Sequence, residues 1–358
     1  MIPSLGLVFL AASCFGLPDG GVKNILTKTT FEVSCMATYD SNLLKFSSRD
    51  RERYLDDIEF HKSPVQTLDD LRTDYTATAE FRPECFRKLT TSFRGTINLA
   101  RHLNDPIKNF NWISLTGRQD ISRRVTATVN FFYEPEYYIR DYLDIHTNAV
   151  HHCRFSLYQW RGDLTWRPRW LFDATVSLKS KQYRYNTYFT EYDGNAIEPK
   201  LRLVYRPRGW RIAVDYGYNV FDNSGFRSSD LLPSDSFLDD SEFGQGDYRE
   251  NSYSISVKRE FRALGRDCSL MGLGEFTDRY YTTDRNLFID PMHSERNDRT
   301  LGIEFSGTIS LTKTLELEMG GGNYRRDSNA PLDLVAKLKS YQRWTMWMGV
   351  NYLFKRRG

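Results

Sequence analysis

Apolar and polar residues alternate with a period of two along several long segments of the chain. In Trp210–Asn219, every second residue from Trp210 to Tyr218 is apolar or aromatic, and the residues between them are polar or small. Successive side chains of a β-strand point to opposite faces of the sheet, so the alternation predicts strands with one apolar face. The same pattern occurs in 125–133, 170–180, 253–261, 300–311 and 343–354.

The predicted strands are long. They run for about 9–12 residues or more, whereas strands of soluble domains are usually about 5–6 residues long. A tilted strand that crosses a bilayer needs about 9–11 residues. Counts of twelve or sixteen stay open, since both faces of 109–118 are partly apolar. We expect fourteen strands, at 31–47, 72–83, 89–101, 109–118, 124–138, 149–166, 170–188, 197–206, 210–223, 250–262, 267–282, 299–311, 314–326 and 341–354.

Short basic turns and long acidic connections alternate between these strands. The short ones are 119–124, 167–169, 206–209, 263–267 and 312–313, and the long ones are 48–72, 139–150, 190–198, 225–250 and 282–299. Such sorting is typical of a membrane barrel with two different rims, and an even strand count places both chain ends at one rim.

The fold class that follows is all-β, a single transmembrane antiparallel up-and-down β-barrel. Backbone groups inside a bilayer must be paired within the protein, so a sheet at that depth has to close on itself. Mean hydropathy is −0.57, and a barrel tolerates this value because its inner face is polar. A soluble secreted β-sandwich or propeller is the alternative architecture.

Two sets of side chains have expected positions in such a barrel. Aromatic residues near strand ends should lie at the membrane interfaces, and we assign this place to Trp170, Trp210, Trp344, Tyr352 and Phe354. Charged residues on the polar faces should line the lumen, where they either border a wet channel or pair and fill it. These candidates are Arg161, Asp163, Lys179, Lys181, Arg202, Arg211, Asp215, Lys258, Glu260, Glu275, Glu304, Glu316 and Arg343.

The two ends of the chain differ from the barrel. Leu5–Leu17 is a short apolar stretch of the length of a signal-peptide core, so we expect a signal peptide in 1–20 with cleavage between Ala12 and Gly21. Cys14 ends a sequence similar to a lipidation motif. We expect a short periplasmic segment in 21–30, the barrel in 31–354 and a basic tail in 355–358.

No motif points to catalysis, a metal or a cofactor. The five cysteines form no Cys-x-x-Cys pair, and nucleophile-elbow, zinc-protease and phosphate-loop motifs are missing from the sequence. His146, His151 and His152 form the one histidine cluster, which we interpret as exposed loop residues. A net charge of +3 gives no nucleic-acid signature. We therefore expect a protein that is not an enzyme, with no metal, cofactor or nucleic-acid partner.

At the level of architecture, 31–354 resembles the porin-like outer-membrane β-barrels of Gram-negative bacteria. Tyr341–Phe354 is similar to the C-terminal signal that the barrel assembly machinery recognises, with Phe354 as its last aromatic residue. The sequence Tyr39-Asp40-Ser41-Asn42-Leu43 resembles a pattern in first strands of several barrel families, among them the surface lipoprotein assembly modifiers.

The porin-like resemblance implies an outer-membrane location, contact with outer-membrane lipid and passive passage of small polar solutes. A non-conducting structural or export-partner barrel that docks other envelope components is the alternative function.

Overall fold

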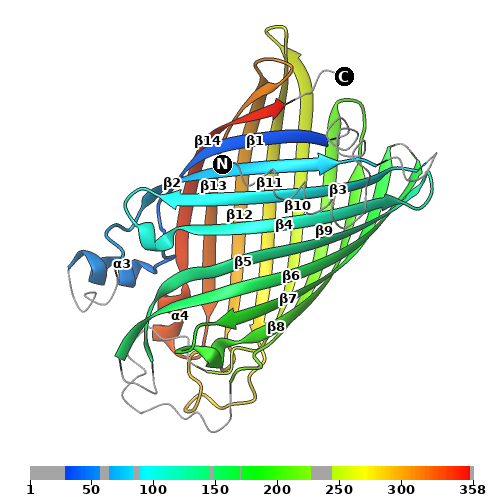
Figure 1. Cartoon of the computed structure of the whole chain (residues 1–358). Helices are drawn as coiled ribbons and strands as arrows, with labels where there is room; N and C mark the ends of the chain where they lie inside the picture. Colours follow the sequence, from blue (N-terminus) through cyan, green and yellow to red (C-terminus); the bar gives the residue numbers. More distant parts are fainter. Residues whose placement is uncertain are drawn as a thin grey trace, which may run out of the picture.

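The protein is a closed antiparallel barrel of fourteen strands, in which each strand pairs with the next and β1 closes the ring against β14 (Figure 1). The computed structural model describes residues 29–56, 64–83, 89–144, 149–169, 171–226 and 244–354. The strands are β1 (Thr29–Asp40), β2 (Asp70–Phe81), β3 (Thr91–His102), β4 (Phe110–Asp120), β5 (Val125–Asp144), β6 (Ala149–Arg169), β7 (Phe172–Tyr185), β8 (Gly194–Tyr205), β9 (Trp210–Asp222), β10 (Tyr248–Ala263), β11 (Arg266–Tyr281), β12 (Asn297–Ser310), β13 (Leu315–Asn329) and β14 (Tyr341–Phe354).

The predicted fold class, strand number and strand order are confirmed, and β14 has the bounds that the sequence predicts. One difference lies at the start of the barrel. The first strand was expected over 31–47, but β1 ends at Asp40. After it, Asn42 binds the backbone of Phe46 through its side chain and turns the chain away from the wall.

The second difference concerns the expected long loop 139–150. Strand β5 continues to Asp144, so only 145–148 separate it from β6. The register shifts between Glu134 and Tyr137 and again between Tyr138 and Arg140. Pro135 lies in the first shift, and because proline has no N–H to give to the ladder, a bulge is how a strand passes it. The β5–β6 hairpin therefore extends well beyond the length that a bilayer needs.

The two ends of the barrel differ in their connections. At the turn end, β1 begins, β14 ends and the chain reverses through 82–90, 121–124, 170–171, 206–209, 264–265 and 311–314. At the loop end lie the connections 41–69, 103–109, 145–148, 186–193, 223–247, 282–296 and 330–340. Helices α3 (Ser48–Leu55) and α4 (Asp333–Lys339) are in two of these loops (Figure 1). No helix in the described part of the chain is long and apolar enough to cross a membrane.

The outer face of the wall is apolar. Exposed large hydrophobic side chains follow every second position, as with Leu201 and Leu203 on β8 or Met346, Met348 and Val350 on β14. The positions between them carry the charged side chains of the interior, for example Lys200 and Arg202. A bilayer-spanning barrel needs this apolar exterior around a polar interior.

Glycines in the wall make room for aromatic rings. The sequence places Gly320-Gly321-Gly322 in a strand, where a bend or bulge was expected, but β13 keeps an unbroken register through all three. A Cβ at Gly320 would collide with the indole of Trp347 on β14 and lie 2.7 Å from the Phe305 carbonyl oxygen. The glycine is therefore required for the close approach of a neighbouring indole.

We predict that Gly320→Leu destabilises the barrel by about 1–3 kcal/mol, because the new side chain overpacks the space that Trp347 fills. Gly162→Leu is the matched control, since a Cβ at Gly162 meets nothing within 4 Å. The stability of both variants is measured as the temperature at which the folded, heat-modifiable gel band disappears on warming in detergent. Equal transition temperatures for the two would contradict this role of Gly320.

Candidate functional site

The first loop, residues 41–69, connects β1 to β2 at the loop end. It begins beside the seam, which is the ladder between β1 and β14 that closes the barrel. Asp40, the last residue of β1, accepts hydrogen bonds from Nε and Nη2 of Arg343 on β14 at 2.9 and 2.8 Å. Ser41 donates its N–H to the Trp344 carbonyl at 3.1 Å and accepts the Trp344 N–H through its hydroxyl at 2.9 Å. The end of the first strand is thus held to the last strand by side chains as well as by the ladder.

Asn42 then turns the loop away from the seam. Its side chain is 1 % exposed. The amide group donates to the carbonyls of Phe46 and Gln342 at 2.8 and 3.0 Å, and its oxygen accepts the N–H of Phe46 at 2.8 Å. One buried side chain therefore fixes both the shape of the turn 42–46 and its distance from β14.

The turn 42–46 packs against the far side of the loop end. Leu43, Leu44 and Phe46 form a buried apolar cluster with Val65 and with Tyr138 of β5, and Ile107 of the second loop packs against it. Arg140 of β5 donates to the Leu44 carbonyl at 2.9 Å, and its guanidinium lies 5.2 Å from the Phe46 ring centre. Strands β2, β3 and β4 separate β1 from β5 in the wall. The turn therefore reaches from β1 to β5, across the positions of β2, β3 and β4 at the loop end.

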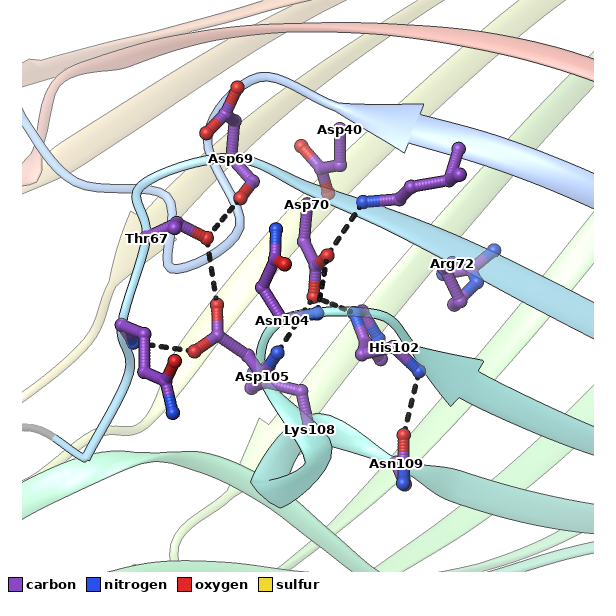
Figure 2. A network of polar contacts seen from close by, with 12 residues as sticks. Asp40, Thr67, Asp69, Asp70, Arg72, His102, Asn104, Asp105, Lys108 and Asn109 are labelled. Atoms are coloured by element: carbon purple, nitrogen blue, oxygen red, sulfur yellow. Dashed lines mark hydrogen bonds and ion pairs between the residues drawn. The ribbon is translucent and has the colours of Figure 1, made fainter.

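A polar network joins the first loop to the second (Figure 2). Asp70, at the start of β2, accepts hydrogen bonds from its neighbour Leu71, from the N–H groups of Asn104 and Asp105, and makes a 3.2 Å contact with Nδ1 of His102. Asp105 in turn accepts the Gln66 N–H at 2.5 Å and the Thr67 hydroxyl at 3.1 Å. Both carboxylates are nearly inaccessible. They tie backbone groups of the two loops into one rigid layer.

Lys108 is buried beside this layer, and its ammonium forms no ion pair with a carboxylate of the described residues. Its ammonium donates to the carbonyls of Tyr138 and Ile139 at 2.8 and 3.2 Å and lies 5.0 Å from the Tyr137 ring centre. Burial, together with the nearby cations Lys45 and Arg140, lowers the pKa of Lys108 to about 7. The buried ammonium thus links the second loop to the extended end of β5.

The structure brings several of the predicted lumen residues together on the interior of β6–β9. Arg161 and Asp163 pair at 2.7 Å. Lys179 and Lys181 both bind Glu198, at 2.8 and 3.1 Å. Asp215 lies 3.3 Å from Lys200 and 3.7 Å from Arg202. On this part of the wall, two cations share each of the carboxylates of Glu198 and Asp215.

The other predicted lumen residues are more scattered, although strand alternation places them all on the interior side. Lys258 and Glu260 pair at 3.4 Å near the turn end of β10, Arg343 binds Asp40, and Glu304 contacts the Tyr324 hydroxyl. Within the described residues, Arg211, Glu275 and Glu316 form no ion pair. Whether these thirteen side chains border a conducting passage stays a prediction.

The predicted interface aromatics lie at both ends of the wall. Trp210, Tyr352 and Phe354 are at the turn end and Trp344 is near the loop end, each between 39 % and 47 % exposed. Tyr352 and Phe354 stack edge to face with ring centres 4.6 Å apart. Trp170 lies outside the described residues, as do the expected signal peptide, Cys14 and the basic tail.

Sequence reasoning missed the network at the loop end. Asp70 and His102 were placed at the edges of predicted elements without a role, and Glu198 and Lys200 were not among the lumen candidates. Glu198 lies directly across from Lys179, and Asp215 across from Arg202, so a register for neighbouring strands would have found these pairs. Of the motif Tyr39–Leu43, the side chains of Asp40, Ser41 and Asn42 hold the turn against β14, and Leu43 joins the buried apolar cluster.

The described residues offer no metal centre: nowhere in them do three His, Cys, Asp or Glu side chains gather closely enough to hold an ion. Cys35, Cys153 and Cys268 are free cysteines on β1, β6 and β11. The expectation of loop histidines is wrong for two of the three, because the β5–β6 hairpin extends further than predicted and places His151 and His152 on β6. His151 stacks on Tyr188 and His152 binds Asp141 at 2.6 Å, while His146 lies outside the described residues.

No protein-family model and no curated protein matches the chain. Among solved structures, it is similar to the outer membrane channel DcaP of Acinetobacter baumannii at 10 % identity, with a TM-score of 0.45, over 91 % of this chain and 96 % of that one. It is also similar to the toluene transporter TodX of Pseudomonas putida, at 8 % identity and a TM-score of 0.44 over 95 % and 90 % of the two chains. A loop-deletion mutant of OmpT, an outer membrane protein of Vibrio cholerae, aligns at 8 % identity and a TM-score of 0.44 over 91 % and 99 %.

We predict that Asn42→Ala releases the turn 42–46. The substitution removes three hydrogen bonds that the Asn42 side chain makes with the backbone of Phe46 and Gln342, so the free energy of local opening should fall by about 2 kcal/mol. Hydrogen exchange of the amides of 43–47, measured by mass spectrometry, should accelerate. Asn104→Ala, at an exposed position of the second loop, is the control. Unchanged protection in the Asn42 variant would refute the role of this side chain.

Proposed function

We propose that the protein is an outer-membrane channel of a Gram-negative bacterium through which small polar solutes pass passively. The observation that carries this proposal is a closed wall of fourteen strands with an apolar exterior and a charged interior. Barrels of about eight strands are filled by their own side chains, and those of sixteen or more leave an aqueous pore. Fourteen strands with a folded loop at the mouth fit a narrow passage.

The charged interior supports passage rather than a solid core. Most exposed large apolar side chains of the strands point outward. Aromatic residues such as Trp112, Phe221 and Trp347 occupy interior positions beside the charged groups. The clusters of buried apolar residues lie among the loops and the extended β5–β6 hairpin. Interior groups such as Glu260 and Arg161 keep exposed side chains, at 69 % and 39 %. Charged groups that retain water within the wall are typical of a hydrated lumen.

We also propose that Tyr341–Phe354 is the segment that the barrel assembly machinery recognises. This segment forms the last strand in full, with its aromatic end at the turn rim. It pairs with β1 to close the ring. Assembly machinery bound to β14 would therefore keep β1 and β14 apart until the other strands have paired.

The channel proposal predicts discrete conductance steps when the full-length protein, extracted in detergent, is added to planar lipid bilayers. The readout is single-channel current in potassium chloride. Heat-modifiable gel mobility verifies that the added protein is a folded barrel. If such folded protein gives no current, the channel proposal is wrong and a non-conducting envelope barrel is favoured.

Release of the first loop should widen the passage. We predict that the double substitution Leu44→Ser and Phe46→Ser raises single-channel conductance and current noise, because it removes the apolar contact with Tyr138 that holds the turn across the mouth. Leu55→Ser in α3 changes a side chain of the same loop that is 72 % exposed and should leave conductance unchanged. Equal conductance in all three proteins would show that the first loop does not narrow the passage.

A further inference from the structure

Lys45 lies at the tip of the turn 42–46 in an unusual conformation. Its φ is +55°, in the left-handed region where a side chain other than glycine or asparagine is uncommon. Its N–H binds the Asn42 carbonyl at 3.0 Å, and its side chain is solvent-accessible. Strained residues of this kind cluster at functional sites, where the surrounding structure holds them in place. Here the buried Asn42 side chain fixes the turn that presents Lys45.

The neighbours of Lys45 are mostly cations. Its enclosure by the barrel lowers the pKa of its ammonium to about 8, and Arg343, Arg326 and Arg279 add electrostatic repulsion, with Asp40 as the one opposing carboxylate among these neighbours. Lys108 of the second loop, whose own pKa is lowered to about 7, is a further cation near Lys45. These groups come from β14, β13, β11 and β1, so the turn presents its charge to the interior of the wall. The ammonium forms no ion pair or hydrogen bond with another described residue.

The three arginines are held rigidly and keep N–H groups to spare. Arg343 uses two donors on Asp40, and Arg279 binds Glu250 at 2.8 Å while stacking 4.0 Å from the Tyr248 ring centre. Arg326 donates through Nε to the Lys339 carbonyl, lies 3.7 Å from Asp298 through Nη1, and stacks 4.8 Å from the Tyr341 ring centre. A guanidinium has five N–H donors in a fixed fork that matches carboxylate and phosphate oxygens. Each arginine therefore has fixed donors left for a ligand.

The charge balance around the turn is positive. Lys45, Arg279, Arg326 and Arg343, together with Arg296 beside Asp298, face the carboxylates of Asp40, Glu250 and Asp298. Glu275 and Glu304 lie further toward the turn end on β11 and β12. Fixed cations with uncommitted donors, enclosed by a low-dielectric wall, attract anions strongly.

We propose that Lys45 and the guanidinium groups of Arg279, Arg326 and Arg343 form a binding site for the oxyanion group, a carboxylate or a phosphate, of a small solute at the barrel mouth. Such a site would define the class of solute that passes through the channel proposed above, and this inference rests on that proposal. An anion held there would be hydrogen-bonded by the guanidinium forks, offset the repulsion among the cations, and lie against the tyrosine rings beside them.

Direct binding tests the site. Calorimetric titration of the full-length protein in detergent with succinate, and separately with inorganic phosphate, should show saturable binding of at least one. Lys45→Gln should weaken it about fivefold or more, and Lys45→Arg should retain it. Lys337→Gln is the matched control, because Lys337 is a lysine of α4 at the same end whose side chain is 69 % exposed. The two probes distinguish a carboxylate-bearing from a phosphate-bearing solute.

The protonation of Lys45 supplies a second readout. Its charge is present below a pKa of about 8 and is lost as the pH rises through it. Affinity for succinate, which is fully ionised in this range, should fall between pH 7 and pH 9 in the wild-type protein. The Lys45→Gln variant should lack this step. A merely structural role of Lys45 in the turn would not produce such a pH profile.

Two results would overturn the site: no binding of either probe to the wild-type protein, or equal binding by the wild-type and Lys45→Gln proteins. The bilayer recordings separate this failure from that of the channel. If the protein conducts current but shows no anion preference that depends on Lys45, the proposed binding site is wrong and the channel proposal still holds. Lys45-dependent binding in a barrel that conducts nothing removes the channel and leaves the site.

Discussion

Closure of the sheet is the constraint on which the rest of the structure depends. A strand at the edge of a sheet leaves a row of unpaired backbone groups, and in hydrocarbon each costs several kcal/mol. The protein meets this constraint with an antiparallel ladder between β1 and β14 that runs from Phe31 opposite Phe354 to Asp40 opposite Thr345. Only with this seam closed can the outer face be uniformly apolar and the charged side chains be enclosed.

The loop end is built directly on the seam. Asp40 binds Arg343, Ser41 exchanges hydrogen bonds with Trp344, and Asn42 reaches the Gln342 carbonyl. The same few residues then send the chain inward, where Leu44 and Phe46 meet the extended end of β5. The position of the turn 42–46 is therefore set by the pairing of the first and last strands, and the proposed anion site at Lys45 depends on the same pairing.

The strands could be predicted from the sequence because their cause is local. Alternation along segments such as Trp210–Asn219 reflects a wall with a polar interior face and an apolar exterior face, and the sequence of each strand shows this pattern without reference to any other strand. The predicted strand ends were wrong where contacts with other parts of the chain determine where a strand ends. Asn42 ends β1 through contacts with Phe46 and Gln342, and the bulges of β5 are held in place by pairing with β6.

The candidate site was predictable only in part. Many of the charged interior positions follow from alternation alone, and Tyr39–Leu43 stood out as a motif. Which charges meet depends on register, as for Glu198 between Lys179 and Lys181. The network of Asp70, His102 and Asp105 depends on two loops that are distant in sequence and meet in the folded protein. Neither kind of contact leaves a periodic signal.

A disulfide across the seam tests the central claim most directly. Cys35 of β1 is a free cysteine opposite Val350 of β14, on the same lipid-facing side. On mild oxidation in detergent, the Val350→Cys protein should form an intramolecular disulfide between β1 and β14, identified by mass spectrometry of the proteolysed chain. Val257→Cys, on the outer face of β10, should form no link to Cys35. A Val350→Cys protein that links only between chains, or not at all, would contradict a closed barrel.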